Sequence, residues 1–114
     1  MKISCAKITA ASWNRQELQR KLIRVAHSSN VWAYAYNLSN NSDSGTMYIQ
    51  FKGNKGGPGD LYAYYDVPLR VYKKWITAVS KGHFFHVNIR DVYLYNKLTG
   101  DKKGKLRNAV YRGV

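Results

Sequence analysis

Alternating apolar and polar or aromatic positions mark the middle of the chain. Residues 31–36, 46–52 and 61–65 each alternate with a period of two, which is typical of β-strands because successive side chains point to opposite faces. Residues 37–45 are rich in Asn, Asp and Ser, and residues 53–60 are rich in Gly, so both read as turns. The pattern predicts three strands in an antiparallel meander.

Apolar residues at helical spacing lie on both sides of this strand region. Upstream, Asn14 is a good N-cap and Glu17 stands three residues later, the spacing of a capping box. The apolar residues that follow predict a helix that continues to about residue 26. Downstream, Pro68 suits the first turn of a helix, and the spacing of apolar residues after it predicts a helix that ends near Gly82.

The C-terminal part of the chain shows weaker signals. Residues 84–89 suggest a second short helix or turn, and residues 92–95 suggest a fourth strand. We therefore expect a single small α+β domain, with an N-terminal helix and an antiparallel sheet of three to four strands packed against one or two helices. Its parts would be a basic helical extension (1–30), the main domain (31–95) and a basic hairpin or tail (96–114).

The chain of 114 residues has a strong positive charge. It contains 19 Lys and Arg residues against 6 Asp and Glu residues, for a net charge of +13. Most of this charge lies in the two ends. Such a field attracts polyanions, so we expect nucleic acid as the partner. An acidic protein surface, or a charge that only keeps the protein soluble, are the alternatives.

Cysteine content and hydropathy indicate a cytoplasmic protein. The one cysteine, Cys5, cannot form an internal disulfide, which suits a reducing compartment. No apolar run approaches the roughly 20 residues that cross a bilayer, and Lys7 interrupts the apolar N-terminus, unlike a secretory signal. We expect no membrane partner.

Few residues are arranged for catalysis or for cofactor binding. The acidic residues are scattered over a cap, loops and turns, and acid–base chemistry needs them to converge. His83 and His86 are three residues apart, but the sequence supplies no clear further ligands. The glycine-rich loop 53–60 lacks the Gly-Lys-Ser/Thr ending of a P-loop, and is instead a basic flap for a sugar–phosphate backbone or a plain hairpin loop. We expect no enzyme, no metal and no cofactor.

Aromatic residues on the predicted strands form a second signal. We expect one sheet face to point inward, with the following residues: Val31, Ala33, Ala35, Met47, Ile49, Phe51, Leu61, Ala63 and Tyr65. The opposite face would then be aromatic, with Trp32, Tyr34, Tyr36, Tyr48, Tyr62 and Tyr64. Aromatic platforms between cations are how sequence-tolerant proteins bind single strands. Two alternatives stay open: the N-terminal helix covers this face through Trp13 and Leu18, or a homo-oligomer forms on it.

These signals together define the expected nucleic-acid contacts. The expected phosphate contacts are Lys52, Lys55, Lys73, Lys74, Lys81, Arg90, Lys102, Lys103, Lys105 and Arg107. The expected stacking residues are Trp32, Tyr34, Tyr48 and Tyr62.

The second half of the chain contains a characteristic run of residues: Asp66-Val67-Pro68, Val71-Tyr72, Trp75, Ala78, Ser80, Gly82, Phe84-Phe85, Ile89-Arg90 and Tyr93. This run resembles the KTSC domain, a small module of bacterial and phage proteins that is also appended to some lysyl-tRNA synthetases. Tyr36-Asn37 and Ile49 to Lys52 extend the resemblance upstream. The resemblance implies that the chain has the fold of this family and works in a bacterial or phage-infected host cell. It carries no catalytic motif.

The most consistent hypothesis is a non-enzymatic protein that binds RNA or single-stranded DNA. Duplex DNA is less favoured because the sequence shows no helix-turn-helix or zinc motif, and the link to a tRNA synthetase favours RNA. The alternative is a phage-type protein-interaction module that binds and modulates an acidic host or viral protein, or that forms part of a virion or its assembly machinery.

Overall fold

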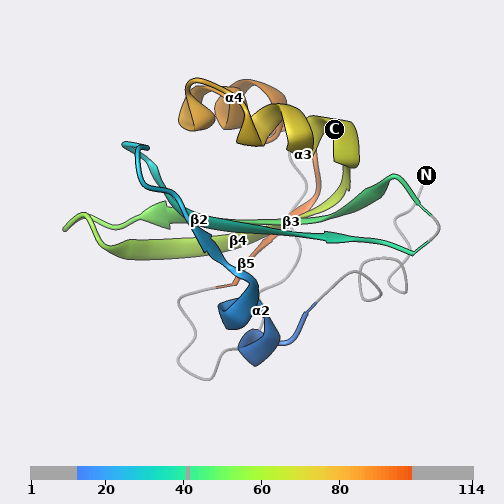
Figure 1. Cartoon of the computed structure of the whole chain (residues 1–114), viewed down its shortest axis with the longest axis horizontal. Coiled ribbons are helices and arrows are strands. Elements are labelled where there is room, and N and C mark those ends of the chain that lie inside the picture. The colour runs from blue at the N-terminus through green and yellow to red at the C-terminus, as the bar shows by residue number, and fades with distance from the viewer. Residues whose placement is uncertain (1–12, 41, 99–114) are drawn as a thin grey trace.

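The computed structural model describes residues 13–40 and 42–98. Five antiparallel strands form one sheet in the order β1-β2-β3-β4-β5. Helices α3 and α4 lie over one face of this sheet and α2 lies on the other (Figure 1). In chain order the elements are α2 (Arg15–Lys21), β1 (Ile23–Arg24), β2 (Val31–Leu38), β3 (Ser44–Lys52), β4 (Pro58–Pro68), α3 (Leu69–Ile76), α4 (Lys81–Asn88) and β5 (Tyr95–Lys97). The expected α+β class and meander are confirmed, with five strands rather than three or four.

The N-terminal helix has the expected capping box but is shorter than expected. The Asn14 side chain accepts a hydrogen bond from the Glu17 amide at 2.8 Å, and the Glu17 carboxylate accepts one from the Asn14 amide at 2.9 Å. Helix α2 ends at Lys21 rather than near residue 26, because Ile23–Arg24 pairs with β2 as an edge strand. Strand pairing therefore overrides the helical spacing of the following apolar residues.

The register of the strands corrects the expected division of the sheet faces. Tyr34 pairs with Ile49, and Ile49 pairs with Tyr62, so these side chains share the face that α3 and α4 cover, here called the α3–α4 face. Ala35, Tyr48 and Ala63 also pair and share the opposite face, here called the α2 face. The expected grouping of Ile49 with Ala35 and Ala63 is wrong, because register, not alternation within each strand, decides which strand faces coincide.

A β-bulge contributes to this change of face. Val31 pairs with Phe51, but Ala33 pairs with Gln50, so Trp32 is the extra residue between the two pairs. A bulge places two residues of one strand opposite one residue of its partner. Val31 therefore lies on the α3–α4 face with Phe51, while Ala35 lies on the α2 face.

Each face of the sheet has its own hydrophobic core. On the α3–α4 face the buried residues are Val31, Met47, Ile49, Tyr64, Val67, Trp75, Phe85 and Ile89. On the α2 face they are Leu18, Ala35, Tyr48, Leu61, Ala63, Tyr65, Leu94 and Leu98. Because both faces are covered, the central strands carry apolar side chains on both sides rather than an apolar-in, polar-out alternation.

The two helices on the α3–α4 face are tied together at their junction. Helix α3 follows Pro68 and ends at Ile76, earlier than the expected end near Gly82. The indole N–H of Trp75, which is fully buried, donates to the carbonyl of Lys81 at 3.1 Å. Ser80 then caps α4, because its hydroxyl accepts from the His83 amide at 3.3 Å. The second short helix suggested by residues 84–89 is thus confirmed as α4.

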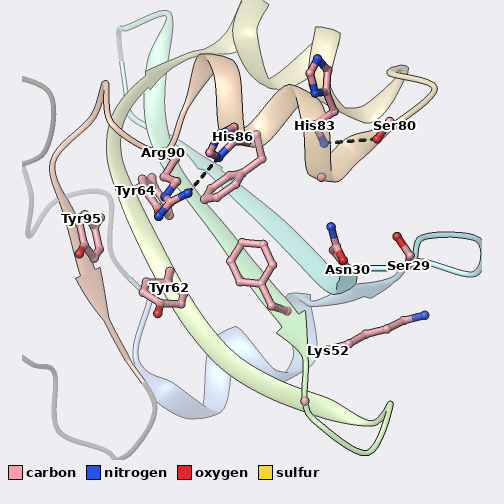
Figure 2. A pocket seen from close by; sticks show the side chains of 14 residues that line it. Ser29, Asn30, Lys52, Tyr62, Tyr64, Ser80, His83, His86, Arg90 and Tyr95 are labelled. Atoms are coloured by element: carbon pink, nitrogen blue, oxygen red, sulfur yellow. Dashed lines mark hydrogen bonds between the residues drawn. The ribbon is translucent and has the colours of Figure 1, made fainter.

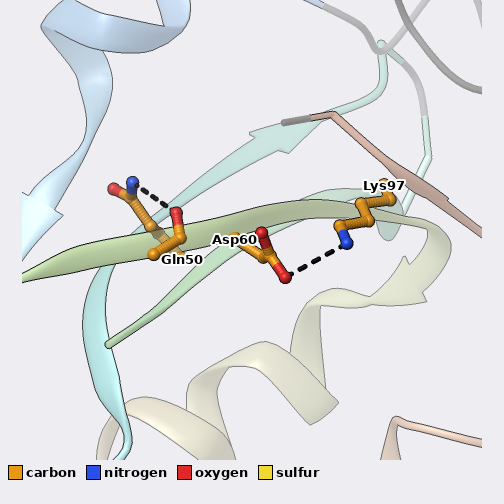
Figure 3. A network of polar contacts seen from close by, with 4 residues as sticks. Gln50, Asp60 and Lys97 are labelled. Atoms are coloured by element: carbon orange, nitrogen blue, oxygen red, sulfur yellow. Dashed lines mark hydrogen bonds and ion pairs between the residues drawn. The ribbon is translucent and has the colours of Figure 1, made fainter. Parts of the chain in front are cut away.

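The last strand begins later than the sequence suggested. Residues 92–94 still belong to the turn after α4 or to the link that follows, and β5 is Tyr95–Lys97. Lys97 forms an ion pair with Asp60 of β4 at 3.2 Å, and Gln50 donates to the Gly59 carbonyl at 3.1 Å (Figure 3). The basic hairpin or tail expected after Leu98 lies outside the described residues.

The glycine-rich segment forms a tight turn. The Gly53 amide donates to the Gly57 carbonyl at 2.7 Å, and β4 already begins at Pro58. A Cβ atom on Gly59 would lie 2.8 Å from the Gly53 backbone nitrogen, so the two backbones meet closely at this point. The loop is therefore a short β3–β4 hairpin turn.

Candidate functional site

A cleft of about 860 Å³ lies between α4 and the sheet on the α3–α4 face (Figure 2). Its walls come from the loop before β2, the end of β3, the middle of β4, helix α4 with the residues just before and after it, and β5. The cleft has an aromatic part made of Phe51, Tyr62, Tyr64, Phe85 and Tyr95. Its polar part consists of Ser29, Asn30, Lys52, Ser80, His83, His86 and Arg90, with Gly53 and Gly82. None of these lining residues is acidic.

The aromatic part is built by neighbouring strands and by α4. Tyr64 pairs with Tyr95 across β4 and β5, and their rings stack at 5.2 Å with an interplanar angle of 22°. Tyr62 lies 5.7 Å from Tyr95 and 5.8 Å from Phe51, measured between ring centroids. Tyr64 is only 3% exposed, whereas Tyr62 and Tyr95 are partly exposed. Tyr62, Tyr95 and Phe51, which is also partly exposed, are therefore the cleft rings with surface left for a ligand, and the two tyrosines lie beside each other.

Arg90 supplies a cation beside these rings. Its Nη1 lies 2.9 Å from Nδ1 of His86, the residue four positions earlier (Figure 2). A guanidinium can only donate, so Nδ1 accepts this hydrogen bond and the imidazole proton sits on Nε2. The contact holds the guanidinium at the cleft without neutralising its charge. An exposed guanidinium of this kind is well suited to bind a phosphate or a carboxylate.

The two cations of the cleft form no ion pair within the described part of the chain. Within residues 13–40 and 42–98, neither Lys52 nor Arg90 pairs with a carboxylate, whereas Lys97 and Asp60 do pair. Lys52 comes from the end of β3, across the cleft from Arg90 (Figure 2). Two cations that flank an aromatic wall, neither ion-paired within the described ranges, make the cleft attractive to an anion that also has a planar group.

The two histidines of α4 do not act as a pair. His86 points toward Arg90, while the exposed ring of His83 projects away from the sheet (Figure 2). In the described part of the chain there is no group of three His, Cys, Asp or Glu residues that could hold a metal ion. Cys5 lies outside the described residues.

The predicted phosphate contacts are only partly brought together. Lys52 and Arg90 line the cleft, while Lys55 is exposed in the β3–β4 turn and Lys73 and Lys74 are exposed in the last turn of α3. Lys81 is already engaged: its ammonium donates to the Ile76 carbonyl at 3.0 Å and lies 5.8 Å from the Trp75 ring. The predicted contacts Lys102, Lys103, Lys105 and Arg107 lie outside the described residues.

The expected single aromatic face is wrong, because helices cover both sides of the sheet. Tyr48 is 2% exposed and stacks on Trp13 at 5.4 Å, as in the alternative in which the N-terminal helix region covers it. Tyr34 packs edge-on against Trp75 at 5.1 Å. The Arg24 guanidinium covers the ring of Trp32 at 3.4 Å. Tyr62 is the one predicted stacking residue that lines the cleft.

Other cleft residues were missed by the sequence-based prediction. Tyr95 was assigned to a strand, but its place beside Tyr62 depends on the pairing of β5 with β4. His86 and Arg90 are four residues apart, a spacing that puts side chains on one side of a helix and that could have linked them. Asn30 gave no sequence signal, since it enters the cleft through the loop before β2.

Comparison with known proteins places this geometry in a family. The model of the KTSC domain matches residues 27–93. The chain belongs to the KTSC domain family. This KTSC protein is also similar to the crystal structure of a KTSC domain protein from Yersinia pestis, with 30% sequence identity and a TM-score of 0.55, over 69% of this chain and 97% of that one. No curated protein gave a match.

The family match covers most of the cleft but not all of it. Residues 27–93 include β2, β3, β4, α3, α4 and the turn that carries Arg90. Helix α2 and strand β5, which supplies Tyr95, lie outside the match. Neither the name of the family nor that of the Yersinia pestis protein states a ligand or a reaction.

None of the helices in residues 13–40 and 42–98 has the length and hydropathy of a membrane-spanning segment.

Proposed function

We propose that this KTSC protein binds single-stranded nucleic acid, RNA or single-stranded DNA, in the cleft between α4 and the sheet. The observation that carries this proposal is the placement of two partly exposed rings, Tyr62 and Tyr95, between two cations, Lys52 and Arg90, which form no ion pair with any carboxylate of residues 13–40 and 42–98. Proteins that bind single strands combine these two elements: aromatic surfaces for the bases and a positive groove for the backbone.

The two parts of the cleft would bind different parts of the ligand. A base that stacks on Tyr62 or Tyr95 would contribute about 1–3 kcal/mol. Arg90 would donate to phosphate oxygens from its planar guanidinium, and Lys52 would contact a neighbouring phosphate as a point charge. A double helix keeps its bases stacked inside, where they cannot reach these rings, so a single strand fits the cleft better.

The overall charge supports the same ligand class at longer range. The net charge of +13 accelerates the capture of a polyanion and adds sequence-independent affinity. Exposed lysines outside the cleft, namely Lys55, Lys73 and Lys74, are suited to additional phosphate contacts. Together with a bacterial or phage-infected cytoplasm as the expected setting, this favours binding as the role and gives no reason to propose catalysis.

An acidic protein partner is the second candidate. Val87 and Val92 are 56% and 50% exposed, in α4 and in the turn after it. Exposed apolar side chains near Arg90 suit a protein surface that combines carboxylates with apolar contacts. In that case the protein would bind and modulate a host or viral protein, or would act as a virion or assembly component.

A titration at two salt concentrations tests the proposed function. Labelled U10 and dT10 are titrated with the full chain, and a hairpin duplex of equal charge is the comparison. If about five phosphates are contacted, log K falls with log salt with a slope of about −3.5 for a single strand. Both single strands are expected to bind more tightly than the duplex. Absence of binding at low salt would reject the proposal, and capture of an acidic protein that survives nuclease treatment would favour the second candidate.

A further inference from the structure

His86 and Arg90 form a contact that depends on the protonation state of the imidazole. Nη1 of Arg90 lies 2.9 Å from Nδ1 of His86, and both exposed side chains line the cleft (Figure 2). A guanidinium stays charged and can only donate hydrogen bonds, so Nδ1 accepts here only while the imidazole is neutral. A proton on Nδ1 would replace this hydrogen bond by a contact between two donors and two positive charges.

The residues that line the cleft include no carboxylate that could stabilise a charged imidazole. Asp91 follows Arg90 in the chain but is not part of the wall. An opposite charge within about 4–6 Å favours the charged form of a titratable group, and within the cleft only a ligand can supply it to His86. The titratable and charged groups that line the cleft with His86 are Lys52 of β3, Tyr62 and Tyr64 of β4, Tyr95 of β5, His83 of α4, and Arg90 of the turn after α4.

A phosphate is the ligand group that fits both side chains. Its oxygens accept from more than one donor at once, and the contact with His86 engages one of the five N–H groups of the Arg90 guanidinium. Hydrogen bonds from charged donors to phosphate are about twice as strong as neutral ones, so a phosphate would offset the loss of the contact between the two side chains. Because these side chains already lie 2.9 Å apart, both can reach the same phosphate.

Resting on the proposed function, we propose that Arg90 and His86 bind one phosphate of the strand together, and that His86 takes up a proton from solvent when this phosphate binds. The proton adds to the lone pair of Nδ1 as Arg90 turns from Nδ1 to the phosphate oxygens. The new Nδ1–H then donates to the same phosphate, and no covalent bond to the ligand forms. Because the complex holds one proton more than its free components, affinity rises as pH falls, by at most about tenfold per pH unit.

A pH series tests this proposal. The full chain is titrated at one ionic strength with the uridine octamer U8, between about pH 5.5 and about pH 7.5, the range in which imidazoles change charge. U8 without a terminal phosphate does not itself titrate there, because its phosphodiesters stay ionised and uracil stays neutral, and its affinity is expected to be at least about fivefold higher at the lower pH. If U8 binds equally at both pH values, the proton uptake is wrong although the cleft still binds nucleic acid. If U8 binds at neither pH, the proposed function itself fails.

Two histidine variants assign the pH dependence to one ring. His86→Gln keeps an acceptor for Arg90 but cannot take a charge, and because His86 is exposed the fold should not change. This variant is expected to abolish the rise in U8 affinity at low pH. His83→Gln is the matched control and should keep the rise, because His83 is also exposed on α4 but its ring projects away from the sheet (Figure 2). An undiminished rise in His86→Gln, or an equal loss of the rise in both variants, would overturn the proposal.

Calorimetry counts the proton directly. The heat of U8 binding at about pH 6.5, in the middle of that range, is measured in two buffers with different enthalpies of ionisation, and the difference gives the number of protons that the complex takes up. The unmodified chain is expected to take up a measurable fraction of one proton, and His86→Gln markedly less. Zero uptake by the unmodified chain, or the same uptake by His86→Gln, would overturn the proposal.

Discussion

Two tyrosine clusters lie on the same face of the sheet, and they differ in what covers them. The closed cluster consists of Tyr34, Tyr36, Tyr72 and Tyr93 near α3, and the open cluster consists of Tyr62, Tyr64 and Tyr95 near α4. Tyr36 stacks on Tyr72 at 4.3 Å with an angle of 7°, and its hydroxyl donates to the Val67 carbonyl at 2.6 Å. In the open cluster, Tyr62 and Tyr95 line a cleft.

The difference shows that packing, not residue type, decides which aromatic side chains line a cleft. Tyr72 of helix α3 stacks on Tyr36 of β2, so each ring covers one face of the other. Helix α4 contacts the sheet through Phe85, which lies 5.3 Å from Tyr64 and 5.0 Å from Phe51, but its first turn carries Gly82 beside the cleft. The rings of the closed cluster are partly buried against one another and do not line the cleft, whereas Tyr62 and Tyr95 line it next to the buried Tyr64.

The largest effect is expected from a change in the core beneath the closed cluster. Trp75 is fully buried and contacts Tyr34 and the Lys81 carbonyl. Trp75→Ala should lower the free energy of unfolding by about 3–5 kcal/mol, because it leaves a large cavity. Chemical denaturation measures this change. A loss below about 1 kcal/mol would contradict the assignment of this region to the core.

Leucine substitutions in the two clusters should have opposite consequences. Tyr62→Leu and Tyr95→Leu keep apolar bulk but remove the ring, and each should weaken U8 binding by about 1–3 kcal/mol if a base stacks there. Tyr72→Leu, the matched change in the closed cluster, should reduce stability and leave affinity unchanged. Fluorescence anisotropy and denaturation on the same samples separate the two. If Tyr72→Leu weakens U8 binding as much as Tyr62→Leu does, the proposed difference between the two clusters is wrong.

The closed cluster should also make the free energy of unfolding depend on pH in the alkaline range. Burial, followed by the neighbouring Tyr72, Asp43 and Tyr93, raises the pKa of Tyr36 from 10.0 to about 12. Burial also raises the pKa of Tyr72. The folded state thus holds these phenol protons more tightly than the unfolded state, so their contribution is complete below pH 10 and is lost as pH rises toward 12.

Tyr36→Phe tests this pH dependence. Unfolding measured between pH 9 and about pH 11.5 should show a shallower loss of stability in the variant than in the unmodified protein, because one raised pKa has been removed. Tyr62→Phe serves as the control from the open cluster. Identical pH profiles for Tyr36→Phe and the unmodified protein would show that this hydroxyl does not titrate as a buried group.

The smallest effect is expected on the α2 face. Asn14→Ala removes the side chain that accepts from the Glu17 amide, and loss of such a cap costs about 1 kcal/mol. Thermal denaturation should detect the lower stability. U8 affinity should not change, because the cleft lies on the other face of the sheet. A loss of affinity in the folded variant would mean that α2 takes part in binding.

Local signals in the sequence predicted parts of this structure well. The Asn14–Glu17 capping box and the α+β meander depend on residues close in sequence, and both were predicted. The division of the sheet faces was not, because it depends on strand register and on the bulge at Trp32. The predicted fourth strand was also displaced, since pairing with β4 places β5 at Tyr95–Lys97.

The candidate site was predicted only in part for the same reason. Lys52, Tyr62 and Arg90 were singled out by charge or by strand position, and all three line the cleft. Nothing in the sequence showed that Tyr48 would be covered while Tyr62 would not, because that outcome depends on where α2 and α4 pack. Whether an aromatic side chain is exposed depends on the tertiary structure around it, and the alternation of residues along one strand cannot predict that.

The most direct test compares two arginines that carry the same charge at different places. Arg90 lines the cleft, and Arg20 is exposed on α2, at the other face of the sheet. Arg90→Gln is expected to weaken U8 binding at least tenfold at moderate salt, whereas Arg20→Gln should weaken it no more than about twofold, because it changes only the long-range field. Equal losses for the two folded variants, or no binding by the unmodified protein, would contradict the assignment of the cleft as the binding site.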